Sequence, residues 1–347
     1  AQMKFTQCRA GALALALSVW PSLAGGSRAL VTRIGAARAR VARQPPVRMM
    51  YSDSRPTIEY MEYLRDGEEF PDMNDMPSAI LGAGRIGETL FELCGMEGDI
   101  LLKRGDPIPA DFEGPIYVAT RNDDLAAIID ACPESKRDDL IFLQNPMIEP
   151  LLKRYAMTDN SQVNIYFAVA KKGAKPIDGL TDTNPEGLTS ATGKWASAVQ
   201  QRLARGELSC KVLNKRDFRR ANIEKHIWLC AFMVIGTAQS HMAGKPLTVG
   251  DVEKYYSEQL DTMVRQLGYA SRTMLSAAPP TGLEERLRAY ARAVADFPTA
   301  MKEFKWRNGF WYNYSKLCLE KGFDDQMDLH TEYVEYCIDN GLVNVDS

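Results

Sequence analysis

The feature that most constrains this chain is a glycine-rich turn directly after a short apolar run. Residues 78–81 predict a buried strand, residues 82–87 read Gly-Ala-Gly-Arg-Ile-Gly, and a helical pattern begins at residue 88. In a strand–turn–helix with this spacing, the first glycine permits the tight turn and the second lets the backbone approach a diphosphate. The third lets the helix pack on the strand, and the diphosphate lies at the helix N-terminus, where free N–H groups favour an anion. We therefore predict a dinucleotide cradle formed by Gly82, Ala83, Gly84, Arg85, Ile86 and Gly87.

The end of the next predicted strand indicates which dinucleotide is bound. NAD-binding proteins place an Asp or Glu about 20 residues after the first glycine, where it binds the ribose 2′-OH. Here Leu102 is followed by Lys103 and Arg104. These cations suit a 2′-phosphate, so we predict NADP(H) as the cofactor. The alternative is a basic strand end that only faces solvent.

The order of patterns predicts a sheet region followed by a helical region. Apolar runs at 78–81, 99–102, 115–119, 139–143 and 163–170, with helical segments between the first of them, predict a mostly parallel sheet. A late strand at 210–213 follows a predicted helix at 191–205. The fold class is thus an α/β Rossmann domain with a mostly parallel sheet, followed by an all-α C-terminal domain. We assign residues 77–215 to the NADP-binding Rossmann domain and residues 216–347 to the helical domain.

In the second region the apolar spacing becomes helical and strand signals stop. Helices are predicted at 219–241, 249–275, 283–295, 301–321 and 327–340. In the fourth of these, Phe310, Tyr314 and Leu317 recur at helical spacing and predict a buried face. The cleft between the two regions is the expected ligand site.

The N-terminal segment has the composition of a targeting peptide. Residues 1–52 contain no acidic residue but one lysine and seven arginines, about +8, so the rest of this chain of net charge −3 carries about −11. A charged start, an apolar run at 10–19 and small residues near 25 resemble a secretory signal, and the Arg- and Ala-rich stretch 27–50 resembles a transit peptide. This order predicts import into an organelle, a plastid (chloroplast) first and a mitochondrion as the alternative. Residues 53–76 are predicted to be an acidic linker.

Composition excludes several other classes of function. An acidic body disfavours nucleic-acid binding, and no run of about 18 apolar residues predicts a membrane span. Seven cysteines without a CxxC pair, and only three histidines, disfavour a metal site or a disulfide framework. The stretch 187–195 resembles a phosphate-binding loop, but the spacing is one residue too long and Trp195 replaces the hydroxyl residue. We interpret it as the N-terminus of a helix.

Beyond these patterns, the chain resembles ketopantoate reductases from about residue 77 to 322. These enzymes join a Rossmann domain to a C-terminal domain like that of 6-phosphogluconate dehydrogenase. The resemblance rests on the glycine turn, on Tyr-Val-Ala-Thr-Arg at 117–121, on Leu-Gln-Asn at 143–145, on Ile-Glu-Lys-His-Ile-Trp at 223–228, and on Glu303 followed by Trp-Arg-Asn-Gly-Phe at 306–310.

The resemblance implies a role for several residues. Arg121 would contact a cofactor phosphate, and Asn145 would lie near the nicotinamide and the substrate. Lys225 would be the catalytic proton donor and Glu303 would bind substrate, with Thr299 and Asn308 as weaker substrate candidates. Without the resemblance, Lys225 reads as a helix-surface lysine, Glu303 as an exposed glutamate and Asn145 as a helix cap. The implied enzyme is an NADP-dependent oxidoreductase acting on a CH–OH/C=O pair of a small molecule. A homodimer, or membership of an organelle complex, is the expected assembly.

The chain departs from the family at the substrate side. Leu229 stands where an Asn follows the family's lysine by one turn, and Pro146 follows Asn145 where the family prefers Gly. Three hypotheses follow. The first is an NADPH-dependent reductase of a small 2-keto acid, resembling 2-dehydropantoate 2-reductase. The second is a non-catalytic NADP-binding protein that acts as a redox sensor or as a subunit of an organelle assembly. The third, a hydroxyisobutyrate- or phosphogluconate-type dehydrogenase, ranks last because the Asn–Lys pairing of those enzymes is missing.

Overall fold

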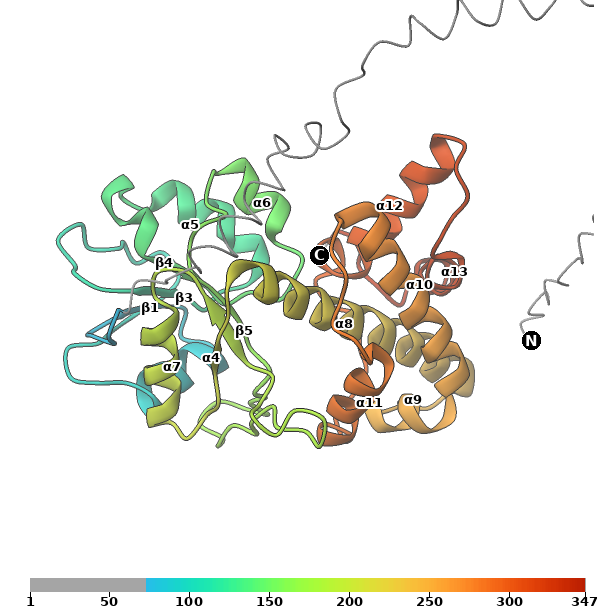
Figure 1. The fold of residues 1–347 in the computed structure, drawn as a ribbon, viewed down its shortest axis with the longest axis horizontal. Helices are drawn as coiled ribbons and strands as arrows, with labels where there is room; N and C mark the ends of the chain where they lie inside the picture. The colour runs from blue at the N-terminus through green and yellow to red at the C-terminus, as the bar shows by residue number, and fades with distance from the viewer. Residues whose placement is uncertain (1–72, 347) are drawn as a thin grey trace, which may run out of the picture. The chain divides into compact units, whose positions relative to one another are not determined.

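The computed structural model describes residues 73–346, which belong to one compact unit of the chain. The predicted targeting peptide (1–52) and residues 53–72 of the predicted linker lie outside the described residues. Of the linker's last residues, Asp75 is tied to the body by ion pairs with Arg202 and Arg205. A sheet region and a helical region follow one another along the chain (Figure 1).

The sheet region has the predicted topology. Its seven strands lie in the order β2-β1-β3-β4-β5-β6-β7. Their bounds are β1 Ala79–Leu81, β2 Ile100–Leu102, β3 Ile116–Val118, β4 Leu140–Phe142, β5 Gln162–Asn164, β6 Ser190–Thr192 and β7 Lys211–Val212. All neighbours pair in parallel except β5 and β6. The mostly parallel α/β sheet is therefore confirmed, and the carboxyl ends of β1, β2 and β3 lie along one edge.

Helices cover both faces of this sheet, as strands buried on both sides require. One face packs against α4 (Arg85–Glu88), the π-helical turn η2 (Thr89–Leu93) and α7 (Ala196–Arg205), with Ile80, Tyr117 and Ile141 in its core. The other packs against α5 (Leu125–Ala131) and α6 (Glu149–Arg154) (Figure 1). Because strand side chains alternate, neighbouring residues of one strand supply the two cores.

The helical region is built around α8 (Lys215–Ala243). Asn214 caps its start by accepting from the backbone N–H of Asp217, and Gly244, with φ of +63°, ends it. The helices α9 (Val249–Tyr255), α10 (Ser257–Leu275), α11 (Leu283–Ala293), α12 (Asn308–Glu320) and α13 (Asp328–Asp339) surround it. Fifteen residues of α8 are buried, so this helix is the core of the region. No helix among residues 73–346 is long and apolar enough to cross a membrane.

Four local predictions were wrong. Strand β6 lies within the loop-like stretch 187–195, so α7 begins at Ala196 and not at residue 191. Tyr256 divides the predicted 249–275 helix into α9 and α10. Residues 301–307 lie outside α12 and include only a short 3₁₀ turn, η5 (Phe304–Trp306). In α12, Phe310 and Tyr314 are partly buried and pack against the helical core as predicted, so the prediction fails only at Leu317, which is 48% exposed. The fully buried positions of this face include Trp311 and Ser315.

Candidate active site

The glycine turn has the geometry that its sequence predicts. Gly82 has φ of +107°, and a Cβ there would lie 2.7 Å from Ala119 O. A Cβ on Gly87 would lie 1.8 Å from Gly82 O, so this position needs glycine for close packing of helix and strand. A Cβ on Gly84 would meet nothing within 4 Å, which leaves open space above the turn. The turn is therefore tight below and open above, which fits a bound diphosphate.

A cavity of about 950 Å³ opens above this turn. It is lined by residues 81–86, by the β2 end at 103–108, by residues 119–121 after β3, by one side of α5, and by Glu303 from the helical region. The structure thus brings together eight of the nine predicted cofactor residues, Gly82, Ala83, Gly84, Arg85, Ile86, Lys103, Arg104 and Arg121. Gly87 lies buried behind the turn.

Two acidic residues that the sequence reasoning missed share the cationic end of this cavity. Arg104 Nη2 donates to the Asp124 carboxylate at 2.7 and 3.0 Å, and Asp106 accepts from the backbone N–H of Lys103 at 2.7 Å. The side chain of Arg104 is 78% exposed, so water screens this pair and a phosphate can compete for the guanidinium. Among residues 73–346, Lys103 Nζ has no ion-pair partner. Asp124 stands at the end of the turn after β3, and this position in the sequence was the signal that could have indicated its place in the cavity.

Arg85, the fourth residue of the turn, is held by the segment that follows β5. Its Nη1 donates to Val169 O at 2.8 Å and to Ala170 O at 3.3 Å, which lie beyond β5. The arginine therefore links the phosphate turn to the chain segment between β5 and β6.

Lys225 is buried on α8 and is not a surface lysine. Its side chain lies with Nζ 5.2 Å from the ring centre of Tyr166, and Nζ donates to Ile165 O. Burial and the positive charge of Arg307 lower the pKa of Lys225 from 10.5 to about 7, and Glu303 opposes this shift. A lysine with a pKa near neutrality exchanges a proton readily at physiological pH.

Glu303 and Arg307 complete this group, which we call the Lys225 cluster. The Glu303 carboxylate pairs with Arg307 Nη2, and the two side chains are 14% and 11% exposed. Glu303 has φ of +49°, a left-handed conformation that costs a non-glycine residue about 1–2 kcal/mol. The sequence reasoning missed Arg307, although it stands inside the quoted Trp-Arg-Asn-Gly-Phe stretch.

The segment 303–307 also fastens the helical region to the sheet region. Trp306 Nε1 donates to the Asp123 carboxylate at 2.7 Å, and Trp306 O accepts from the backbone N–H of Met147 at 2.6 Å. These contacts hold the segment that carries Glu303 against the sheet region, where Glu303 lines the cavity.

Three other predicted residues lie outside the cavity lining. Asn145 is half-buried, its carbonyl accepts from Asn122 Nδ2 at 2.9 Å, and the N-cap of α6 is Ile148. Thr299 Oγ1 donates to Leu247 O, and its side chain packs against Gly236. Asn308 is buried, with Nδ2 3.0 Å from Cys230 O and 3.2 Å from His330 Nε2. Their proposed contacts with substrate remain predictions.

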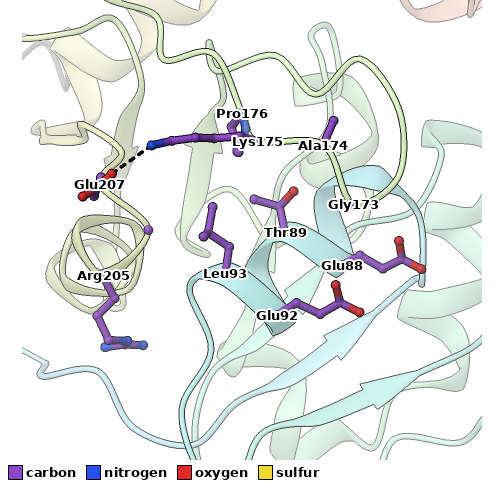
Figure 2. A pocket seen from close by; sticks show the side chains of 11 residues that line it. Glu88, Thr89, Glu92, Leu93, Gly173, Ala174, Lys175, Pro176, Arg205 and Glu207 are labelled. Carbon is purple, nitrogen blue, oxygen red and sulfur yellow. Dashed lines mark hydrogen bonds and ion pairs between the residues drawn. The ribbon is translucent and has the colours of Figure 1, made fainter.

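A second cavity lies on the far side of the phosphate helix and carries none of the predicted residues. Figure 2 shows Glu88 and Glu92 on one of its walls and an ion pair between Lys175 and Glu207 on the other. That pair is 3.1 Å long, and both side chains are more than three-quarters exposed. The cavity above the glycine turn carries the predicted cofactor residues and is therefore the stronger candidate site.

Comparison with solved structures identifies the fold. A PanE/ApbA family ketopantoate reductase from Ralstonia eutropha JMP134 is matched with a TM-score of 0.55 at 13% identity, over 77% of this chain and 100% of that one. A dimeric ketopantoate reductase from Staphylococcus aureus is matched with a TM-score of 0.53 at 13% identity, with the same coverage. D-mandelate dehydrogenase with NADH and anilino(oxo)acetate is matched with a TM-score of 0.53 at 11% identity, again over 77% and 100%.

The chain therefore has the fold of the ketopantoate reductases, as the quoted motifs predicted. This fold is shared with a dehydrogenase whose structure holds NADH. The sequence itself matches no protein-family model and no curated protein.

Proposed function

We propose that this protein is an NADPH-dependent reductase of a small 2-keto acid and that Lys225 is its proton donor. One observation carries the proposal: a buried lysine with a pKa near 7 neighbours Glu303, which lines the same cavity as the glycine turn. Such a combination of a dinucleotide cradle and a perturbed titratable group is typical of active sites. The solved structures with this fold include reductases and a dehydrogenase, which supports the proposal.

Different residues are proposed to bind the diphosphate and the 2′-phosphate of the cofactor. The backbone at 82–86 would hold the diphosphate, with Arg121 beside it, and Lys103 and Arg104 would hold the 2′-phosphate. When bound, the nicotinamide supplies a hydride. We propose NADP(H) over NAD(H) because the β2 end offers two cations, one of them without an ion-pair partner among the described residues.

Proton transfer falls to Lys225. As an ammonium it would donate a proton to the alkoxide oxygen as the carbonyl is reduced, a role worth about 10²–10⁴-fold in rate. Glu303 favours this protonated form, whereas burial and Arg307 disfavour it, so the three groups together set the pKa near neutrality. Asn145 is proposed to orient the carbonyl or the nicotinamide.

The test is NADPH oxidation, followed by absorbance, with a panel of 2-oxo acids that includes ketopantoate. The proposal expects turnover with at least one acid and its loss in Lys225→Met. Tight NADPH binding with no turnover across the panel would reject the reductase.

A second candidate is a non-catalytic NADP-binding protein. It is favoured by the position of Lys225 Nζ, which donates to Ile165 O and does not line the cavity. Tight NADPH binding without turnover of any 2-oxo acid would support it, and comigration of the native protein with a large assembly would extend it to a subunit role. An activity that is lost in Lys225→Met would reject it.

We also propose that the protein acts in an organelle, a plastid first, and that it forms a homodimer. The first rests on the composition of residues 1–52, the second on the dimeric ketopantoate reductase that shares the fold. Fusion of residues 1–52 to a fluorescent protein tests the predicted localisation. Sedimentation of the purified protein tests the dimer.

A further inference from the structure

The charges of the Lys225 cluster do not balance. With Lys225 protonated, it contains two cations, Lys225 and Arg307, but only one carboxylate, Glu303. The next carboxylate along α8, Glu224, is already paired with Arg286 through bonds of 2.7 and 3.0 Å. The other groups that face Lys225 are the ring of Tyr166 and the carbonyl of Ile165, and neither carries a negative charge at neutral pH.

Arg307 also has unused donors. Only its Nη2 has a side-chain partner among residues 73–346, and its Nε is buried without any partner. Its backbone is well anchored, because its carbonyl oxygen lies 3.2 Å from His226 Nε2. A buried guanidinium with free N–H groups is costly unless an anion with matching geometry binds it.

We propose that Arg307 is the carboxylate-binding residue of this site and that it selects a substrate that carries a carboxylate. The substrate carboxylate binds the guanidinium beside Glu303 and supplies the missing negative charge. The 2-oxo group of the substrate then faces Lys225 on α8, whose side chain is close enough to Arg307 to be affected by its charge. This inference rests on the proposed reductase function and assigns the residue that selects its substrate.

A consequence concerns the proton on Lys225. An anion bound to Arg307 cancels the charge that disfavours the ammonium form, so ligand binding raises the pKa of Lys225 above about 7. At pH 8, binding of the anion is therefore accompanied by proton uptake, and the substrate itself loads the proton that the reaction consumes.

Oxamate is the probe, because it carries a carboxylate next to a carbonyl that is not reduced. Its binding to the full chain is measured by titration calorimetry with and without saturating NADPH, at pH 8 in buffers of different ionisation enthalpy. We expect binding with proton uptake in the wild type and at least about tenfold weaker binding in Arg307→Gln. Arg307→Lys, which keeps the charge but loses the planar pair of donors, should be intermediate.

Two further variants control for folding and for general charge. Glu303→Gln/Arg307→Gln removes both members of the buried pair, so no unpaired charge remains, and it should bind oxamate as weakly as Arg307→Gln. Lys305→Gln removes an exposed cation over the Trp306 ring and should bind as the wild type does. A wild type that ignores oxamate, or an Arg307→Gln protein that binds it equally well, overturns the inference.

The outcomes separate this inference from the reductase proposal. Arg307-dependent oxamate binding without turnover of any 2-oxo acid would keep the carboxylate site and reject the reductase. Turnover of a 2-oxo acid with the same kcat/KM in wild type and Arg307→Gln would keep the reductase and reject the carboxylate site.

Discussion

Two buried charge clusters in this protein are built on opposite principles. The Arg202 cluster, on α7, joins Arg202 and Arg205 to Asp75 and Asp99, two cations to two carboxylates. Arg202 is fully buried, and each of its three nitrogens has a partner, including bonds of 2.7 and 2.9 Å to Asp99. The Lys225 cluster, with Lys225 protonated, has two cations, one carboxylate and an unpartnered Nε on Arg307.

The difference separates a structural site from a candidate functional one. Burial opposes the ionisation of Asp99, yet hydrogen bonds from Arg202 and two backbone N–H groups hold its pKa below the ordinary value. Every charge there is neutralised within the chain, so nothing remains for a ligand to bind. In the Lys225 cluster the protein leaves one negative charge to be supplied from outside, and it does so beside the cavity of the glycine turn.

The largest expected effect, on the rate of reduction, comes from removing the amine of the Lys225 cluster. Lys225→Met deletes the proton donor but keeps most of the side-chain volume, so NADPH oxidation with a 2-oxo acid should fall by about 10²–10⁴-fold. Steady-state kinetics measures this. Unchanged NADPH binding by fluorescence titration would show that the cofactor cavity is intact.

In the Arg202 cluster, replacing the buried cation by methionine should lower the stability of the fold. Arg202→Met leaves Asp99 buried without its ion-pair partner, while Asp75 keeps Arg205, and breaking a buried pair costs about 3–5 kcal/mol. Urea unfolding measures the loss. Lys172→Met, which removes an exposed pair with Glu88, is the matched control and should change stability by less than about 1 kcal/mol.

Lys225→Met should also stabilise the fold, with a defined pH dependence. The folded pKa of about 7 lies below the ordinary value of 10.5, so between these values the unfolded chain holds a proton that the folded chain lacks. The penalty of burying Lys225 is therefore complete below pH 7 and fades as the pH rises to 10.5. We expect Lys225→Met to gain about 2–4 kcal/mol at pH 6 and much less at pH 10. A gain that grows with pH would contradict this account.

A smaller effect, on the pH dependence of catalysis, tests Glu303, the carboxylate of the Lys225 cluster. Glu303 favours the ammonium form of Lys225, so Glu303→Gln lowers its pKa further. Because the reduction needs the protonated amine, kcat/KM should decrease above about pH 7 in the wild type, and this decrease should begin about one pH unit lower in the variant. An identical pH profile in both proteins would remove Glu303 from the site.

The smallest effect is expected at the exposed ion pair between Arg104 and Asp124, since water screens this pair more than the two buried clusters. Asp124→Asn should change stability by less than about 1 kcal/mol, because Arg104 is mostly exposed. It frees Arg104, however, so NADPH binding should tighten a few-fold while NADH binding stays the same. Fluorescence titration with both dinucleotides distinguishes these results.

The sequence predicted most of the sheet region because local chemistry determines it there. The glycine turn can be read from the residues themselves, since each glycine answers a steric demand over a few residues. Strand β6 escaped prediction because its apolar content is low and its position depends on pairing with β5, far along the chain.

The candidate site was predicted less completely for a related reason. Resemblance pointed to Lys225 and Glu303, but neither spacing nor composition placed Arg307 beside them, because these residues meet only when segment 303–307 packs against α8. The same holds for Asp124 opposite Arg104, twenty positions away. Conversely, Asn308 shares the motif of Glu303 but points into the core toward Cys230 O, because it begins α12.

The strongest test of Lys225 as the proton donor is the position of its Nζ in a crystal structure with NADPH and oxamate. We expect that Nζ has left Ile165 O and lies within hydrogen-bond distance of the oxamate carbonyl oxygen, next to the nicotinamide C4, with the carboxylate on Arg307. A structure in which Lys225 still donates to Ile165 O while the ligand binds elsewhere would contradict it.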